Sequence, residues 1–163
     1  MKILLLVTCS LMLQACPMVD FKELRYTRKL LKKSDLVGIW EPTEETRQFI
    51  LKSGKYENKI IQIKLGDNDS IEILNIPDWW KDGFGQSHGK FETILGSWKL
   101  ELDTSMRFLP VCKISISTNN YVTSFNMYRQ TPPYGIFIGV GDPNDGKAMI
   151  YEKTLEIYKN EKP

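Results

Sequence analysis

Few residues in this chain of 163 have side chains suited to chemistry. There are three cysteines, Cys9, Cys16 and Cys112, and one histidine, His88. One histidine excludes a site with several imidazole ligands and any mechanism that needs two imidazoles. We also find no matched acid–base pair, no nucleophile motif and no set of metal ligands with a known spacing. We therefore expect no enzyme, and no catalytic residue, cofactor or metal site.

Cys16 ends an N-terminal segment that differs from the rest of the chain. The segment is MKILLLVTCSLMLQAC, with one lysine followed by a mainly apolar run. A charged start, a run of about 7–15 apolar residues and a small residue at the exit are typical of a secretory signal. The run is shorter than the roughly 18–20 residues of a membrane-spanning helix. We predict that residues 1–15 are a signal peptide.

The end of this segment, Leu13-Gln14-Ala15-Cys16, resembles the lipobox of bacterial lipoproteins. The resemblance implies that a diacylglycerol, with acyl chains such as palmitate, is attached to the Cys16 thiol, and that Cys16 becomes the N-terminus. Two or three acyl chains hold a protein firmly in a membrane. Pro17 follows, and the lack of aspartate there implies a bacterial envelope protein in the outer membrane, facing the periplasm. The alternative is an ordinary secretory signal with a cysteine at its exit.

The remaining cysteine, Cys112, has no partner for a disulfide once Cys9 leaves and Cys16 is acylated. It alternates with Ile114 and Ile116 in VCKISIS. We therefore expect a small buried hydrophobic residue. A reactive thiol is the alternative, although no nearby helix start or histidine would lower its pKa.

Residues 16–34 are predicted to be a lipid-anchored basic tether. Within 19–35, six lysines and arginines stand against three acidic residues, with helix-forming residues and neither Gly nor Pro. Either this is a solvated helical spacer, or its basic surface lies against anionic lipid headgroups.

From residue 35 the apolar pattern changes to the alternation of β-strands, and we assign 35–163 to one domain. Thr43 as N-cap, two glutamates in the first turn and Gly54 past the end predict a short helix after the first strand. Eight strands are predicted, at 36–41, 59–65, 70–76, 97–103, 111–117, 121–128, 134–140 and 148–154. Their short spacings favour a mainly β fold, an antiparallel eight-stranded barrel, with a β-sandwich as the alternative.

The first strand contains Gly38-Ile39-Trp40, which resembles the Gly-x-Trp signature of the lipocalin family. The resemblance implies a lipocalin-like barrel in which Trp40 closes one end and packs under a basic residue of a late strand. Lys153 is the matching residue, where lipocalins more often carry arginine. The predicted helix after the first strand departs from the lipocalin plan, which has a loop there.

A second resemblance covers residues 36–153. LVGIWEP, NIPDWW, GSWKLEL, PPYGIFIGVGDPNDG and MIYEK together look like a group of small bacterial proteins with no established activity. This supports one domain and one fold, and it adds no chemistry.

The connection IPDWWKDGFGQSHGKF, residues 76–91, is the segment most suggestive of binding. Long loops on a rigid scaffold often carry function. We expect contacts to a ligand or partner from Trp79, Trp80, Phe84 and His88. Because neighbouring residues of an extended chain face opposite ways, we expect one tryptophan to be exposed, or else both to plug the barrel mouth.

These observations predict a non-enzymatic, lipid-anchored envelope protein. Its barrel would bind a small apolar molecule. The alternative is a tethered interaction factor, such as an inhibitor, an immunity protein or an assembly accessory, that contacts another envelope protein. The net charge of +2 indicates no nucleic-acid partner.

Overall fold

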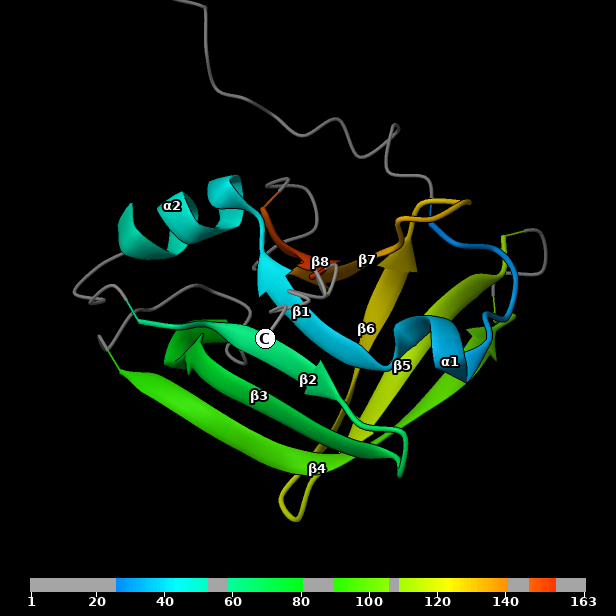
Figure 1. Cartoon of the computed structure of the whole chain (residues 1–163), viewed down its shortest axis with the longest axis horizontal. Helices are drawn as coiled ribbons and strands as arrows, with labels where there is room; N and C mark the ends of the chain where they lie inside the picture. Colours follow the sequence, from blue (N-terminus) through cyan, green and yellow to red (C-terminus); the bar gives the residue numbers. More distant parts are fainter. Residues whose placement is uncertain (1–25, 53–58, 81–89, 106–108, 141–146, 155–163) are drawn as a thin grey trace, which may run out of the picture.

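Eight antiparallel strands form a closed barrel in the computed structural model (Figure 1). The structure describes residues 26–52, 59–80, 90–105, 109–140 and 147–154. The strands are β1 (Gly38–Pro42), β2 (Gln62–Leu65), β3 (Ser70–Pro77), β4 (Phe91–Asp103), β5 (Val111–Ser117), β6 (Val122–Tyr128), β7 (Gly135–Gly139) and β8 (Ala148–Lys153). The predicted mainly β barrel is confirmed, and the β-sandwich is not the fold observed.

Each strand pairs with its neighbours in sequence, and β1 pairs with β8 to close the barrel. The strands therefore run alternately between two ends. One end carries α1 (Lys33–Leu36) and is called the α1 end. The other carries α2 (Glu44–Lys52) and the 3-10 helix η1 (Asp78–Trp80), and is called the α2 end (Figure 1).

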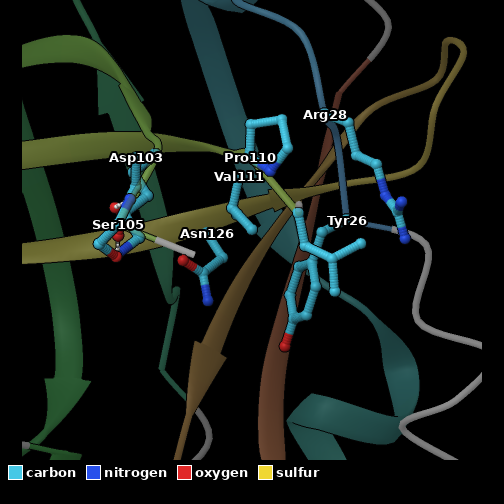
Figure 2. A pocket seen from close by; sticks show the side chains of 9 residues that line it. Tyr26, Arg28, Asp103, Ser105, Pro110, Val111 and Asn126 are labelled. Atoms are coloured by element: carbon cyan, nitrogen blue, oxygen red, sulfur yellow. Dashed lines mark hydrogen bonds and ion pairs between the residues drawn. The ribbon is translucent and has the colours of Figure 1, made fainter. Parts of the chain in front are cut away.

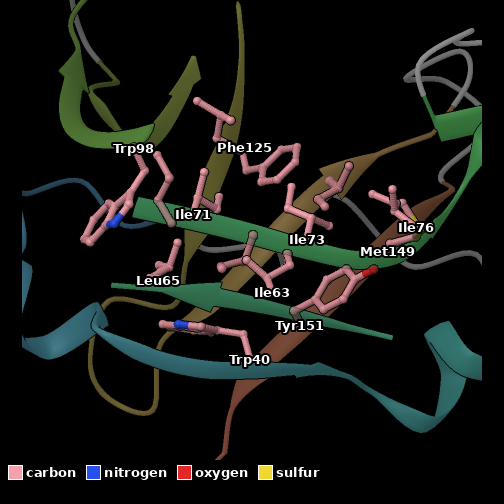
Figure 3. Packing of buried hydrophobic residues seen from close by; sticks show 14 of the residues in the cluster. Trp40, Ile63, Leu65, Ile71, Ile73, Ile76, Trp98, Phe125, Met149 and Tyr151 are labelled. Atoms are coloured by element: carbon pink, nitrogen blue, oxygen red, sulfur yellow. The ribbon is translucent and has the colours of Figure 1, made fainter. Parts of the chain in front are cut away.

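The interior is lined by alternate residues of each strand, as a barrel requires. A continuous apolar cluster runs through it from Leu36 to Tyr151 (Figure 3). In β3 the inward positions are Ile71, Ile73 and then Ile76, because a bulge with Asn75 at φ 51° inserts one extra residue. The bulge keeps both halves of the strand apolar on the inner face.

Strand β4 begins at Phe91, six residues before the predicted start at residue 97. Its first half pairs with the second half of β3. Gly96 lies in the middle of β4, where a Cβ atom would stand 2.4 Å from the Ser117 carbonyl oxygen. The lack of a side chain at Gly96 therefore allows the close approach of the end of β5.

The predicted helix after β1 is confirmed as α2. Thr43 caps it, since its hydroxyl accepts a hydrogen bond from the Thr46 amide at 3.3 Å. The Thr46 hydroxyl accepts a hydrogen bond from the Ile150 amide at 2.8 Å. Thr46 stands at the third position of the helix, where a capping box would have glutamate or glutamine. Its hydroxyl instead fastens α2 to β8.

The predicted helical tether is wrong for residues 26–32, which are not helical. Thr27 is fully buried between β5 and β6: its amide donates to Met127 O at 2.9 Å, and its carbonyl accepts from Cys112 N at 2.7 Å. In a helix, the Thr27 amide and carbonyl would bond to other residues of the same helix. Here the backbone groups of Met127 and Cys112 are their partners. Residues 26–34 therefore pack on the barrel, and the domain begins before residue 35; residues 16–25 lie outside the described residues.

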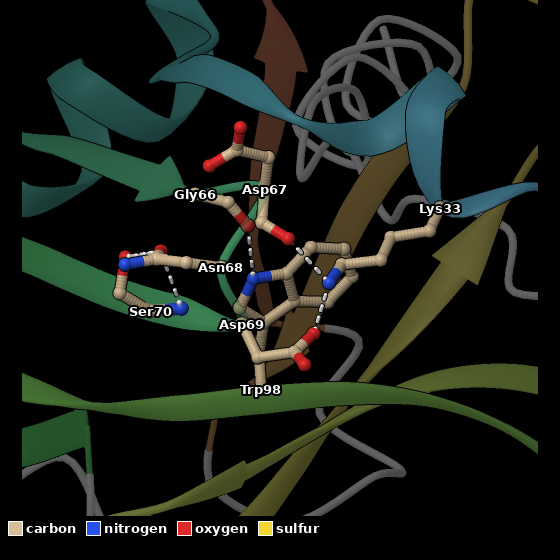
Figure 4. A network of polar contacts seen from close by, with 7 residues as sticks. All are labelled: Lys33, Gly66, Asp67, Asn68, Asp69, Ser70 and Trp98. Carbon is tan, nitrogen blue, oxygen red and sulfur yellow. Dashed lines mark hydrogen bonds and ion pairs between the residues drawn. The ribbon is translucent and has the colours of Figure 1, made fainter.

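The segment continues into α1, which is fastened to the turn between β2 and β3 (Figure 4). The Lys33 ammonium donates to the Asp67 carbonyl oxygen at 2.7 Å, forms an ion pair with Asp69, and lies 5.4 Å from the centre of the Trp98 ring. The Trp98 indole in turn donates to Gly66 O at 3.0 Å. These contacts fix the entry of the chain at the α1 end.

Candidate functional site

Gly38, Trp40 and Lys153, the residues expected to close the barrel, meet at the α1 end. Trp40 is fully buried, lies opposite Lys153 in the β1–β8 register, and donates its indole N–H to Leu36 O at 2.9 Å. Lys153 donates to Asp35 O at 2.9 Å. Gly38 has φ +136°, and a Cβ atom there would stand 3.0 Å from Lys153 Cε. The lysine stem therefore lies directly over the glycine.

At the α2 end, Trp79 and Trp80 are both buried, with exposed fractions of 1% and 7%. Of the two alternatives stated above, exposure of one tryptophan is wrong, and burial of both is observed. The two residues lie in the 3-10 turn η1, not in an extended strand, so their side chains are not forced to opposite faces. Phe84 and His88 lie outside the described residues.

The two indoles join an aromatic cluster that links α2 to β6. Trp79 meets Phe49 of α2 edge to face, with ring centres 5.5 Å apart. Trp80 meets Tyr121 at 6.0 Å and Phe125 at 5.8 Å, also edge to face. Edge-to-face pairs of this kind stabilise an aromatic core. The cluster closes over the interior at this end.

Three hydrogen-bond donors in this part of the interior have no partner among the described residues. They are Trp79 Nε1, Trp80 Nε1 and the Tyr151 hydroxyl, and all three atoms are buried. Tyr151 projects from β8 into the interior together with Met149 (Figure 3). Burying such a group without a hydrogen bond costs about 1–3 kcal/mol, so most proteins avoid it.

Burial also governs the acidity of Tyr151. Desolvation raises the pKa of its hydroxyl well above the ordinary value, and the positive charge of Arg47 on α2 offsets this only in part. The group is therefore a neutral donor at physiological pH. No charged side chain among the described residues is buried. What the site offers is an apolar, aromatic wall with indole and phenol donors.

Sequence reasoning missed Tyr151 as a member of this site. The signal was present, because the alternation in AMIYEK places Tyr151 on the same face as Met149. Cys112, by contrast, is fully buried as expected. Burial raises the pKa of its thiol despite a backbone hydrogen bond from Leu31, so the thiolate that a reactive cysteine needs is disfavoured. Cys16 lies outside the described residues.

A separate pocket of about 350 Å³ lies on the outer wall, beside the N-terminal segment (Figure 2). Tyr26, Arg28, Pro110 and Val111 line it, with Asn126 at its base. The Tyr26 ring is held in place by Phe137, edge to face at 5.6 Å.

Next to this pocket a shallow groove of about 520 Å³ crosses β4, β5 and β6. Asp103 and Lys113 form an ion pair where the two hollows meet. Hydrogen bonds from Lys113 and Ser105 hold the pKa of the Asp103 carboxyl well below its usual range. Ser115 and Glu101 make a second diagonal link along the groove. These four polar side chains are therefore partnered with one another.

Within the described ranges, no group of three or more His, Cys, Asp or Glu side chains is placed to hold a metal ion. No helix in the part of the chain that the structure describes is long and apolar enough to cross a membrane. Comparison with known proteins finds no matching family model, no matching curated protein and no matching solved structure.

Proposed function

We propose that this chain is a lipid-anchored protein of the bacterial cell envelope whose barrel binds a small apolar ligand without catalysing a reaction. The observation that carries the binding role is a set of three buried donors, at Trp79, Trp80 and Tyr151, that have no partner among the described residues. An eight-stranded barrel has room either for its own side chains alone or for these and one small ligand. A ligand with oxygen acceptors would satisfy the donors.

The ligand class follows from the chemistry of this interior. Its walls are isoleucine, methionine and aromatic side chains, which favour an apolar body. The polar groups in question are donors, so the ligand would carry carbonyl, ester, ether or carboxyl oxygens. The α2 end is the place of entry, because α2 and η1 cover it with separate short elements and not with a strand pair.

Native mass spectrometry tests the binding role. The full-length protein would be expressed in bacteria with its signal, extracted from membranes in mild detergent, and measured before and after denaturation. A ligand mass that disappears on denaturation is expected. Trp79→Phe and Trp80→Phe remove one donor each while keeping an aromatic ring, and they should lower the occupancy. A bare polypeptide in the wild type would contradict the proposal.

The anchor is tested in the same preparation. A diacylglycerol on Cys16 would add mass that survives denaturation, because it is covalently bound. Cys16→Ser should abolish labelling by radioactive palmitate and leave the signal unprocessed or release the protein. Labelling that is unchanged in Cys16→Ser would rule out Cys16 as the acylated residue.

A tethered interaction factor is the second candidate, and the outer-wall pocket favours it. This pocket combines the apolar surfaces of Pro110, Val111 and the Tyr26 ring with the exposed Arg28. An acidic side chain beside an apolar residue of a partner protein would fit these groups. If the native mass shows a bare chain, affinity capture with wild type and Arg28→Glu compares the partners retained by each.

A further inference from the structure

Residues 28–32 form a basic surface at the α1 end. Arg28, Lys29 and Lys32 are exposed, and Leu30 between them has an exposed fraction of 57%. We call Arg28, Lys29, Leu30 and Lys32 the basic patch. It combines three cations with one projecting aliphatic side chain.

The barrel holds the basic patch in a fixed place. On one side Thr27 is fully buried, and its hydroxyl donates to Arg129 O at 2.5 Å. Leu31, within the same stretch, is 7% exposed and belongs to the core. On the other side Lys33 is fastened to the turn between β2 and β3 (Figure 4). Because Thr27 and Leu31 point inward, the patch side chains project outward.

The positive charges of the patch are not neutralised by ion pairs within the described structure. None of its three cations forms an ion pair with a described carboxylate. Asp69 and Asp103, at the same end, are paired with Lys33 and Lys113. Asp35 is the one carboxylate within residues 26–36. The segment therefore presents an excess of positive charge around an exposed leucine.

We propose that the basic patch docks on anionic lipid headgroups, with Leu30 entering the interface, so that the α1 end faces the bilayer. Cations near an anionic surface and an apolar side chain at the headgroup boundary both favour binding. Only nine residues, 17–25, separate Cys16 from Tyr26, a reach of about 30 Å when extended. The patch thus lies close to the anchor, and the α2 end is left accessible. This inference rests on the proposed anchor for its setting, but docking itself is testable without it.

Fluorescence quenching on vesicles tests the docking. The full-length processed protein would carry a bulky maleimide fluorophore at Ser34→Cys, which is exposed beside the patch, or at Gln48→Cys, which is exposed on α2. Cys112 is fully buried and should not react. The vesicles contain a quencher-bearing lipid in phosphatidylcholine, with or without phosphatidylglycerol.

We expect quenching at residue 34 that needs phosphatidylglycerol and disappears at high salt, and little quenching at residue 48. Each cation contributes about fivefold, so neutralising all three with Arg28→Gln, Lys29→Gln and Lys32→Gln should lower the docked-to-undocked ratio on the order of 100-fold. The matched control, Lys52→Gln, Lys59→Gln and Lys90→Gln, changes three exposed lysines at the α2 end and should leave it unchanged.

Equal quenching at both positions, or quenching that does not depend on phosphatidylglycerol, would overturn the docking. So would an equal loss in the patch variant and its control. Failure of the anchor is seen separately, because a protein without an acyl chain lacks the covalent mass and does not float with pure phosphatidylcholine vesicles. The docking is then measured on a protein that also carries Cys16→Ser, so that residue 34 alone reacts with the maleimide, and quenching by anionic vesicles still decides whether the patch docks.

Discussion

Replacing Tyr151 with phenylalanine should stabilise the ligand-free protein and weaken its binding. The side chain is fully buried and its hydroxyl has no described partner. A buried hydroxyl without a hydrogen bond costs about 1–3 kcal/mol, and phenylalanine removes the hydroxyl while keeping the ring. We therefore expect the free energy of unfolding to rise by about 1–3 kcal/mol. For a domain of this size each kcal/mol is worth roughly 4 °C, so Tm should rise by about 4–12 °C.

Tyr128→Phe is the matched control for this change. Tyr128 is similarly buried, but its hydroxyl donates to Glu152 Oε1 at 3.2 Å. Loss of a hydrogen bond to a charged group destabilises by about 1.5–3 kcal/mol. The two Tyr→Phe changes should thus have opposite signs.

Urea unfolding of refolded, ligand-free protein measures both variants, with the slope against urea expected to stay constant. Binding is then measured with the ligand extracted from the wild type, and Tyr151→Phe should bind about 10-fold more weakly for a lost hydrogen bond of about 1.4 kcal/mol. A loss of stability above about 1 kcal/mol in Tyr151→Phe would refute the reasoning, because it would mean that the hydroxyl already has a partner in the protein.

Three further predictions concern the frame around the interior. Gly135→Ala should prevent stable folding, since a Cβ atom would stand 1.6 Å from a ring carbon of Tyr128; circular dichroism and urea unfolding measure this. Thr46→Val should destabilise by about 1–2 kcal/mol through loss of the acceptor for the Ile150 amide, while Thr46→Ser should stay within about 0.5 kcal/mol of wild type in urea unfolding. The Asp103 pKa is depressed, so its contribution to stability is present above the unfolded pKa of about 3.9 and is lost as pH falls through the lower folded pKa. The stability difference between wild type and Asp103→Asn should therefore shrink in urea unfolding below about pH 4, and a constant difference would contradict the pKa shift.

The alternation of apolar residues was sufficient to predict the eight strands, because each strand has one face toward the interior, and the capping residues were sufficient to predict α2. Local composition was misleading in the N-terminal segment. Residues 26–32 have helix-forming side chains, but their conformation is set by hydrogen bonds between Thr27 and the backbone of Cys112 in β5 and Met127 in β6.

The candidate site was only partly predictable. Trp79 and Trp80 were identified, but their burial depends on a 3-10 turn and on aromatic partners from α2 and β6 that no local pattern specifies. That the Tyr151 hydroxyl has no partner among the described residues is a property of the assembled interior. Sequence patterns give the face on which a side chain lies, and they do not give its hydrogen-bond partners.

The closure between β1 and β8 has a consequence for the order of folding. All other strand pairs join neighbours in sequence and so can form as hairpins soon after synthesis. The link from Thr46 to Ile150 and the link from Lys153 to Asp35 span more than 100 residues and gather at this one seam. Closure must therefore wait for the last strand to emerge, and until then β1 is an open edge. A circular permutant that joins the natural termini and opens the chain at another hairpin would move the late step to that hairpin.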